Sequence, residues 1–86
     1  MSLSLLPPLY ATEEEPDPVA WVRYFHPATG WEWYATEYDG ERTFFGLVRG
    51  FVGELGYFDR LELEEAGAVL DRGFTPRRLS QVRGRG

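Results

Sequence analysis

Residues 31–48 read WEWYATEYDGERTFFGLV and decide the fold, because they place aromatic and β-prone residues on both sides of an Asp39-Gly40 pair. Asp-Gly between two such runs is typical of a type I′ turn, which needs positive φ at both central residues and matches the twist of the strands it joins. We therefore expect a β-hairpin with a type I′ turn, formed by strands over 31–38 and from residue 43 to about residue 49 or 51.

Two further runs extend this hairpin. Residues 19–26 are rich in β-branched and aromatic side chains and end at Pro27, and Gly30 suits a left-handed position in the loop that follows. Residues 55–58, Leu-Gly-Tyr-Phe, read as a short strand after a glycine-bracketed turn. Together these runs predict an antiparallel meander of about four strands.

Helix signals follow the last of these strands. Asp59 with Glu62 three positions later is typical of an N-cap and capping box, and Gly67 suits the position just after a helix end. Residues 68–70 are compatible with a further helical turn or a short strand. Thr75-Pro76 resembles an N-cap followed by a proline at the first helical position, so we expect a last helical turn over 77–82.

The chain length allows a single domain, since 86 residues bury only about 60–65% of the surface of the unfolded chain. We predict an α+β fold over residues 1–86: a partly ordered arm over 1–18, a folded core over 19–82 and a disordered tail over 83–86. The expected core is an antiparallel meander of about four strands with one capped helix, and the terminal arms pack on it.

Composition excludes several kinds of chemistry. The chain has no Cys, which removes disulfides and thiolate sites, and no Lys, which removes the usual phosphate ligand of a P-loop. His26 is the single histidine, and no nucleophile motif accompanies it. We predict no catalytic residue, no cofactor and no metal site, and a cytoplasmic protein without a membrane span, because no apolar run approaches about 20 residues.

All nine basic residues are arginine, and they are unevenly placed. Residues 1–71 hold all fourteen acidic residues and four arginines, whereas residues 72–86 hold five arginines and no acid. The chain is thus an acidic body with a basic C-terminal end. The absence of Asn and Cys, with a single Gln and a single Met, agrees with a thermophilic source, whereas Arg in place of Lys also follows from the codon usage of a GC-rich genome.

Four short motifs carry a resemblance: LLPPLYATE at 5–13, YATEYDG at 34–40, FFGLV at 44–48 and ELGYF at 54–58. In this order they resemble a small bacterial family labelled as a domain of unknown function and found on plasmids and integrative elements. The resemblance extends from residue 5 to about residue 63. It implies a mobile-element setting and brings no catalytic residues with it.

Acidic residues gather around the central hairpin. Glu32, Glu37, Asp39 and Glu41 supply oxygens that suit a hard cation such as Mg²⁺ or Ca²⁺. Strand alternation puts Glu32 and Glu37 on opposite faces unless a bulge intervenes. We therefore expect a solvated hairpin face in preference to a metal site.

The sheet aromatics are the main candidates for a binding surface. Alternation puts Trp31 and Trp33 on one face of their strand and Tyr34 and Tyr38 on the other. A small meander with one short helix covers one face well. The second aromatic face is then covered either by the ends of the chain or by a partner.

We interpret the sequence as a non-enzymatic accessory or regulatory binding module of a mobile genetic element. It contacts a protein partner, or a second copy of itself, through sheet aromatics or an edge strand. The alternative is single-stranded nucleic-acid binding through Arg77, Arg78 and the C-terminal arginines together with sheet aromatics. A carboxylate- or metal-dependent hydrolase is a more remote alternative.

Overall fold

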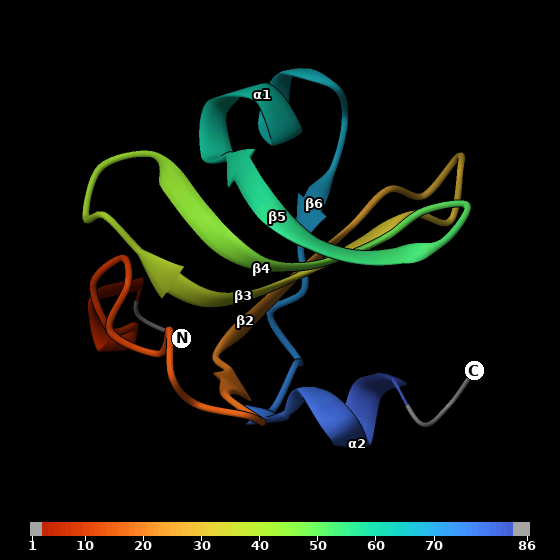
Figure 1. Cartoon of the computed structure of the whole chain (residues 1–86). Coiled ribbons are helices and arrows are strands. Elements are labelled where there is room, and N and C mark those ends of the chain that lie inside the picture. The colour runs from red at the N-terminus through yellow and green to blue at the C-terminus, as the bar shows by residue number, and fades with distance from the viewer. Residues whose placement is uncertain (1–2, 84–86) are drawn as a thin grey trace.

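The computed structural model describes residues 3–83 as a five-stranded antiparallel sheet, a two-stranded sheet and two short α-helices (Figure 1). The α+β single-domain class is confirmed, with a fifth strand in the main sheet, whose order is β5-β4-β3-β2-β6, and a small β1-β7 sheet beside it. The elements are the 3-10 helix η1 (Leu3–Leu5), β1 (Val19–Ala20), β2 (Val22–Phe25), β3 (Glu32–Tyr38), β4 (Thr43–Arg49), β5 (Gly53–Asp59), α1 (Arg60–Glu65), β6 (Val69–Leu70), β7 (Arg77–Arg78) and α2 (Leu79–Arg83).

The predicted central hairpin is present as β3 and β4, but its turn differs from the expected type. Gly40 has φ +91° and Asp39 does not have positive φ, so the type I′ prediction is wrong. The Asp39 carboxylate instead accepts hydrogen bonds from the backbone N–H groups of Glu41, Arg42 and Thr43 at 2.8, 2.9 and 3.1 Å. A side chain that satisfies three backbone donors allows a wider loop than a two-residue turn.

A bulge in β3 changes which side chains share a face. The register with β4 shifts between Ala35 and Glu37, so Thr36 is an extra residue. Tyr34 consequently lies in one core cluster with Leu47, and Tyr38 lies in the other. The prediction that Tyr34 and Tyr38 share a face is wrong, because the bulge reverses the alternation between them.

The face of the sheet that α1 covers, here called the α1 face, holds an aromatic core. Phe44 is fully buried at its centre, with Tyr38 stacked on it at a ring distance of 4.6 Å, Phe58 at 5.5 Å and Tyr24 at 5.8 Å. Leu63 of α1 belongs to this cluster, and Figure 1 shows α1 above the sheet. Burial of several rings around one position makes this the main source of hydrophobic stabilisation.

Both ends of α1 follow the expected capping pattern. The Asp59 carboxylate accepts hydrogen bonds from the N–H groups of Leu61 and Glu62, which confirms the N-cap. Gly67 has φ +100°, and the N–H groups of Gly67 and Ala68 donate to the carbonyls of Glu64 and Leu63. This is the Schellman arrangement that a glycine after the helix end favours.

The C-terminal segment differs from its prediction. Arg77–Arg78 form β7, paired with β1, and the helix α2 begins at Leu79, so the N-cap at Thr75 is wrong. The cap comes from a distant segment, because the Asp17 carboxylate accepts hydrogen bonds from the N–H and the hydroxyl of Ser80. The part of the predicted disordered tail over residues 84–86 lies outside the described residues, and Arg83 belongs to α2.

Candidate functional site

The face of the sheet opposite α1, here called the α2 face, is covered over only part of its width. Leu79 and Val82 of α2 and Phe74 pack there on Tyr34 and Leu47. Figure 1 shows α2 and the N-terminal arm below the sheet, with α1 above it. The ends of the chain therefore cover one part of this face. This agrees with one of the two alternatives for the second aromatic face, namely that the chain's own ends cover it.

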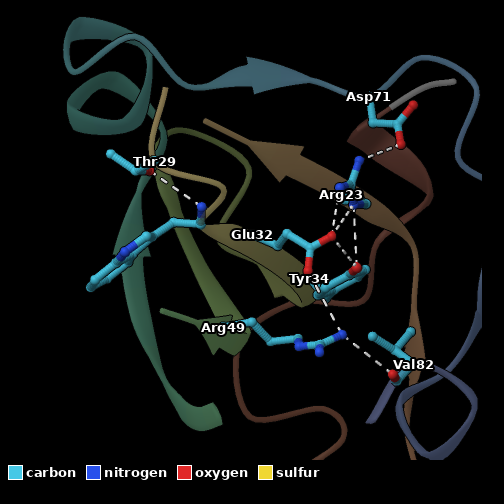
Figure 2. A network of polar contacts seen from close by, with 8 residues as sticks. Arg23, Thr29, Glu32, Tyr34, Arg49, Asp71 and Val82 are labelled. Carbon is cyan, nitrogen blue, oxygen red and sulfur yellow. Dashed lines mark hydrogen bonds and ion pairs between the residues drawn. The ribbon is translucent and has the colours of Figure 1, made fainter. Parts of the chain in front are cut away.

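A network of polar contacts lies on the covered part of the α2 face, beside the apolar cluster of Tyr34 and Leu47 (Figure 2). The Arg23 guanidinium forms ion pairs with Glu32 at 2.5 Å and Asp71 at 2.7 Å, and the Tyr34 hydroxyl donates to Glu32 at 3.0 Å. Arg49 reaches the same Glu32 carboxylate at 3.7 Å. Burial alone raises the pKa of Glu32, but hydrogen bonds from Arg23 and Tyr34 outweigh it, so its pKa is lowered. This carboxylate is a partly buried link between strands, and the prediction of a solvated acidic face is wrong for it.

The arm before β1 is held on the sheet by Glu37. This carboxylate is 2% exposed and accepts hydrogen bonds from the N–H groups of Tyr10 and Thr12, both at 2.8 Å, and from the Thr12 hydroxyl. A buried carboxylate needs such donors, since leaving it unpaired is costly. The prediction of a solvated hairpin acid is therefore wrong for Glu37 as well, because the bulge turns its side chain inward under the arm.

Tyr10 is held in an unusual conformation at the same place. It has φ +72°, a left-handed backbone that a bulky residue adopts at a cost. Tyr10 is also 63% exposed. A hydrogen bond with Tyr10, followed by burial and by the charges of Tyr10, Glu37 and Glu13, raises the pKa of the Tyr57 hydroxyl. The strained residue thus bridges the arm to strand β5.

Between the arm and the sheet lies a groove of about 670 Å³ on the α2 face. Its floor includes Phe45 of β4 and Tyr57 of β5, whose rings meet edge to face at 4.9 Å. Leu55 and Tyr57 are 50% and 55% exposed. The remaining walls are the arm segment over residues 10–18 and the start of α2. This is the uncovered part of the α2 face.

The groove adjoins an edge of the sheet. Strand β5 pairs with β4 on one side and is the last strand in the described sheet order. Its residues Gly53, Glu54, Leu55 and Tyr57 are exposed. An edge strand of seven residues beside exposed apolar side chains presents unpaired backbone groups to a second strand.

The predicted tryptophans lie away from the groove, at the end of the sheet where β4 turns into β5. The Trp31 ring is 6.2 Å from Trp33 and 5.4 Å from Phe51, and it covers Gly50, where a Cβ would come within 2.5 Å of the ring. Phe51 is 95% exposed, whereas Trp31 and Trp33 are partly buried. This cluster is a second exposed aromatic patch.

The other four predicted residues make contacts within the chain. Tyr34 and Tyr38 are buried in the two core clusters, and the Tyr38 hydroxyl donates to the Glu41 carbonyl at 2.7 Å. The Arg77 guanidinium lies over the Phe74 ring at 5.3 Å, and Arg78 donates to the Asp17 carbonyl at 2.8 Å. Nucleic-acid binding through these arginines stays a prediction.

Sequence reasoning missed the groove residues Tyr10, Phe45, Leu55 and Tyr57. The available signal was alternation along residues 54–58, which puts Leu55 and Tyr57 on one face opposite Phe58. The arm contact had no such signal, because it depends on the bulge and on a segment about 25 residues away in the chain.

The chain matches no family model, no curated protein and no solved structure. Across residues 3–83, no three His, Asp or Glu side chains are grouped so that they hold a metal ion. In the same part of the chain, neither helix has the length and hydropathy needed to cross a bilayer.

Proposed function

We propose that this chain is a protein-binding module that receives an extended segment of a partner along β5, over the groove on the α2 face. The observation that carries this proposal is the exposure of Leu55 and Tyr57 beside an edge strand. Extended peptides add to sheet edges through backbone hydrogen bonds, and side-chain pockets at alternate positions give specificity. Both features occur together here.

The groove supports binding better than catalysis. Glu37 is occupied by the arm, and the single histidine, His26, accepts hydrogen bonds from its own loop and contacts the Ala66 carbonyl. The rings of Phe45 and Tyr57 and the side chain of Leu55 supply an apolar contact area. Side chains of a partner displace water from such an area when they bind. The chain is therefore proposed to be non-enzymatic.

The motif resemblance supports a mobile genetic element as the setting, with this chain as an accessory or regulatory component. The cytoplasmic location and the thermophilic source expected from composition stay predictions. A second copy of the chain is a possible partner in this proposal, and the oligomeric state decides it.

The test compares captured partners of the tagged wild-type chain with those of Tyr57→Ser and Leu55→Ser. Both side chains are half-exposed, so their loss leaves the core clusters intact. The matched control is Val69→Ser, an exposed apolar side chain on β6, the opposite edge of the same sheet. A central contact contributes about 2 kcal/mol or more, so binding should weaken roughly 30-fold in the groove variants.

One outcome contradicts the proposal. A partner that binds the groove variants as tightly as the control does not use β5. Sedimentation at two concentrations tests the second copy, which requires self-association that Tyr57→Ser abolishes and Val69→Ser retains.

A further inference from the structure

We propose that the segment received by β5 is basic, with Arg or Lys side chains at alternate positions above the groove. This inference rests on the proposed function and specifies the chemistry of the partner. It follows from the distribution of charge, the arrangement of the rings and the geometry of an added strand.

The charged side chains that line the groove all have the same sign. Four carboxylates line it, and no basic side chain does; the acids are Glu13, Glu15, Asp17 and Glu37. Among the described side chains of residues 3–83, the ion pairs formed by Glu32, Asp59, Glu64 and Asp71 involve neither Glu13 nor Glu15. The two exposed arm glutamates therefore carry charge that no described side chain neutralises through an ion pair, and charge complementarity then favours a cationic partner.

The rings of the groove suit the same kind of partner. An arginine or lysine side chain is attracted to the face of an aromatic ring, and Phe45 and Tyr57 line the groove together with the exposed Tyr10. The charges of Glu37 and Glu13 act at the Tyr57 hydroxyl, where they contribute to its raised pKa. A cation placed there meets ring faces and negative potential together, whereas a phosphate group is repelled.

The geometry of an added strand brings alternate side chains to this position. A strand pairs about 4.8 Å from its neighbour, and its side chains point alternately to the two faces of the sheet. Every second side chain of a segment on β5 thus lies beside Leu55 or Tyr57, on the side of the arm glutamates.

The experiment measures binding of labelled peptides of about seven residues by fluorescence polarisation, matching the length of β5. One peptide alternates Arg with Val, a second alternates Ser with Val, and a third is the Arg-Val peptide with N-methyl groups at alternate backbone nitrogens. The variants are Tyr57→Ser and the pair Glu13→Gln with Glu15→Gln. The control pair is Glu62→Gln with Glu65→Gln, which removes the same charge from the exposed surface of α1.

We expect the Arg-Val peptide to bind about threefold to tenfold more tightly than the Ser-Val peptide, with the preference falling as salt rises. The Glu13 and Glu15 variant should lose that preference, and the α1 control pair should keep it. N-methylation should weaken binding of the Arg-Val peptide, and Tyr57→Ser should weaken binding of both the Arg-Val and the Ser-Val peptide.

The outcomes separate the two proposals. Equal binding of the Arg-Val and Ser-Val peptides, with no effect of the Glu13 and Glu15 changes, overturns the basic partner and leaves the protein-binding module standing. Failure of every peptide to bind, or equal binding of the N-methylated peptide, overturns strand addition on β5 and the proposed function with it.

Discussion

Replacing Glu37 with Gln should release the N-terminal arm and open the groove. The carboxylate accepts three hydrogen bonds, from the Tyr10 N–H, the Thr12 N–H and the Thr12 hydroxyl. Glutamine keeps one acceptor oxygen. If that oxygen faces Thr12, the amide NH₂ group points at the Tyr10 N–H and two donors face each other.

The magnitude follows from these contacts. Hydrogen bonds to a charged group contribute about 1.5–3 kcal/mol each. The variant loses the hydrogen bond from the Tyr10 N–H and places the amide NH₂ against that donor, so the change should cost about 2–4 kcal/mol. The arm retains a separate attachment through buried Leu6 and the bond from the Tyr38 N–H to the Pro7 carbonyl at 2.9 Å. We therefore expect local release of residues 9–15 while the sheet stays folded.

Amide hydrogen exchange measured by NMR checks this prediction. The Tyr10 and Thr12 amides should exchange roughly 30-fold to several-hundred-fold faster in Glu37→Gln, while the Trp21 amide, bonded to the Ala35 carbonyl at 2.8 Å, should be unchanged. The pKa of Tyr57 should fall toward its ordinary value, because Tyr10 leaves it. Thr12→Val, which removes only the hydroxyl contact, should give a smaller effect. Unchanged protection of both arm amides in Glu37→Gln would refute the reasoning.

Three further predictions concern the sheet and its titrating groups. Gly46→Ala should strongly destabilise the fold, since a Cβ would lie 1.9 Å from the Tyr34 carbonyl oxygen, whereas Gly56→Ala at the paired position should be tolerated; denaturant titration compares them. The lowered pKa of Glu32 means that the unfolded chain binds more protons, so the free energy of unfolding should fall as pH drops below about 4.5 through the folded-state pKa, and Glu32→Gln should flatten this dependence. Burial raises the pKa of Tyr24 to about 12, so stability should be lost as pH rises from 10.0 towards that value; a spectroscopic titration in which Tyr24→Phe leaves the high-pH transition unchanged contradicts the assignment.

Local signals predicted the local parts of this fold. The strands around Asp39-Gly40, the N-cap at Asp59 and the glycine after α1 each depend on neighbouring residues and are present. The turn type was wrong although the hairpin was right, because the Asp39 carboxylate satisfies three backbone donors and stabilises a wider loop. The Asp-Gly pattern alone does not predict which backbone N–H groups the Asp39 carboxylate binds.

Long-range pairing decided the parts that the sequence did not predict. Thr75-Pro76 has the pattern of a helix start, yet Arg77–Arg78 pair with β1, so the helix begins later and is capped by Asp17. The alternation of side chains along a strand, which has a period of two residues, likewise does not predict the bulge at Thr36. One extra residue separated Tyr34 from Tyr38 and turned Glu37 under the arm, which moved the candidate surface from the predicted tyrosines to β5.

The groove depends on three departures from a regular meander: the bulge at Thr36, the left-handed Tyr10 and the uncovered part of the α2 face. A strained backbone residue costs about 1–3 kcal/mol, and here the buried Glu37 offsets that cost by binding the Tyr10 N–H. The same contacts hold the arm acids at the rim of the groove and leave Leu55 and Tyr57 exposed. If the arm served only to cover the sheet, a closer apolar contact with β5 would achieve more at lower cost. The proposed partner segment would fill the space between this charged rim and the exposed rings, and the strain at Tyr10 is compatible with that proposal.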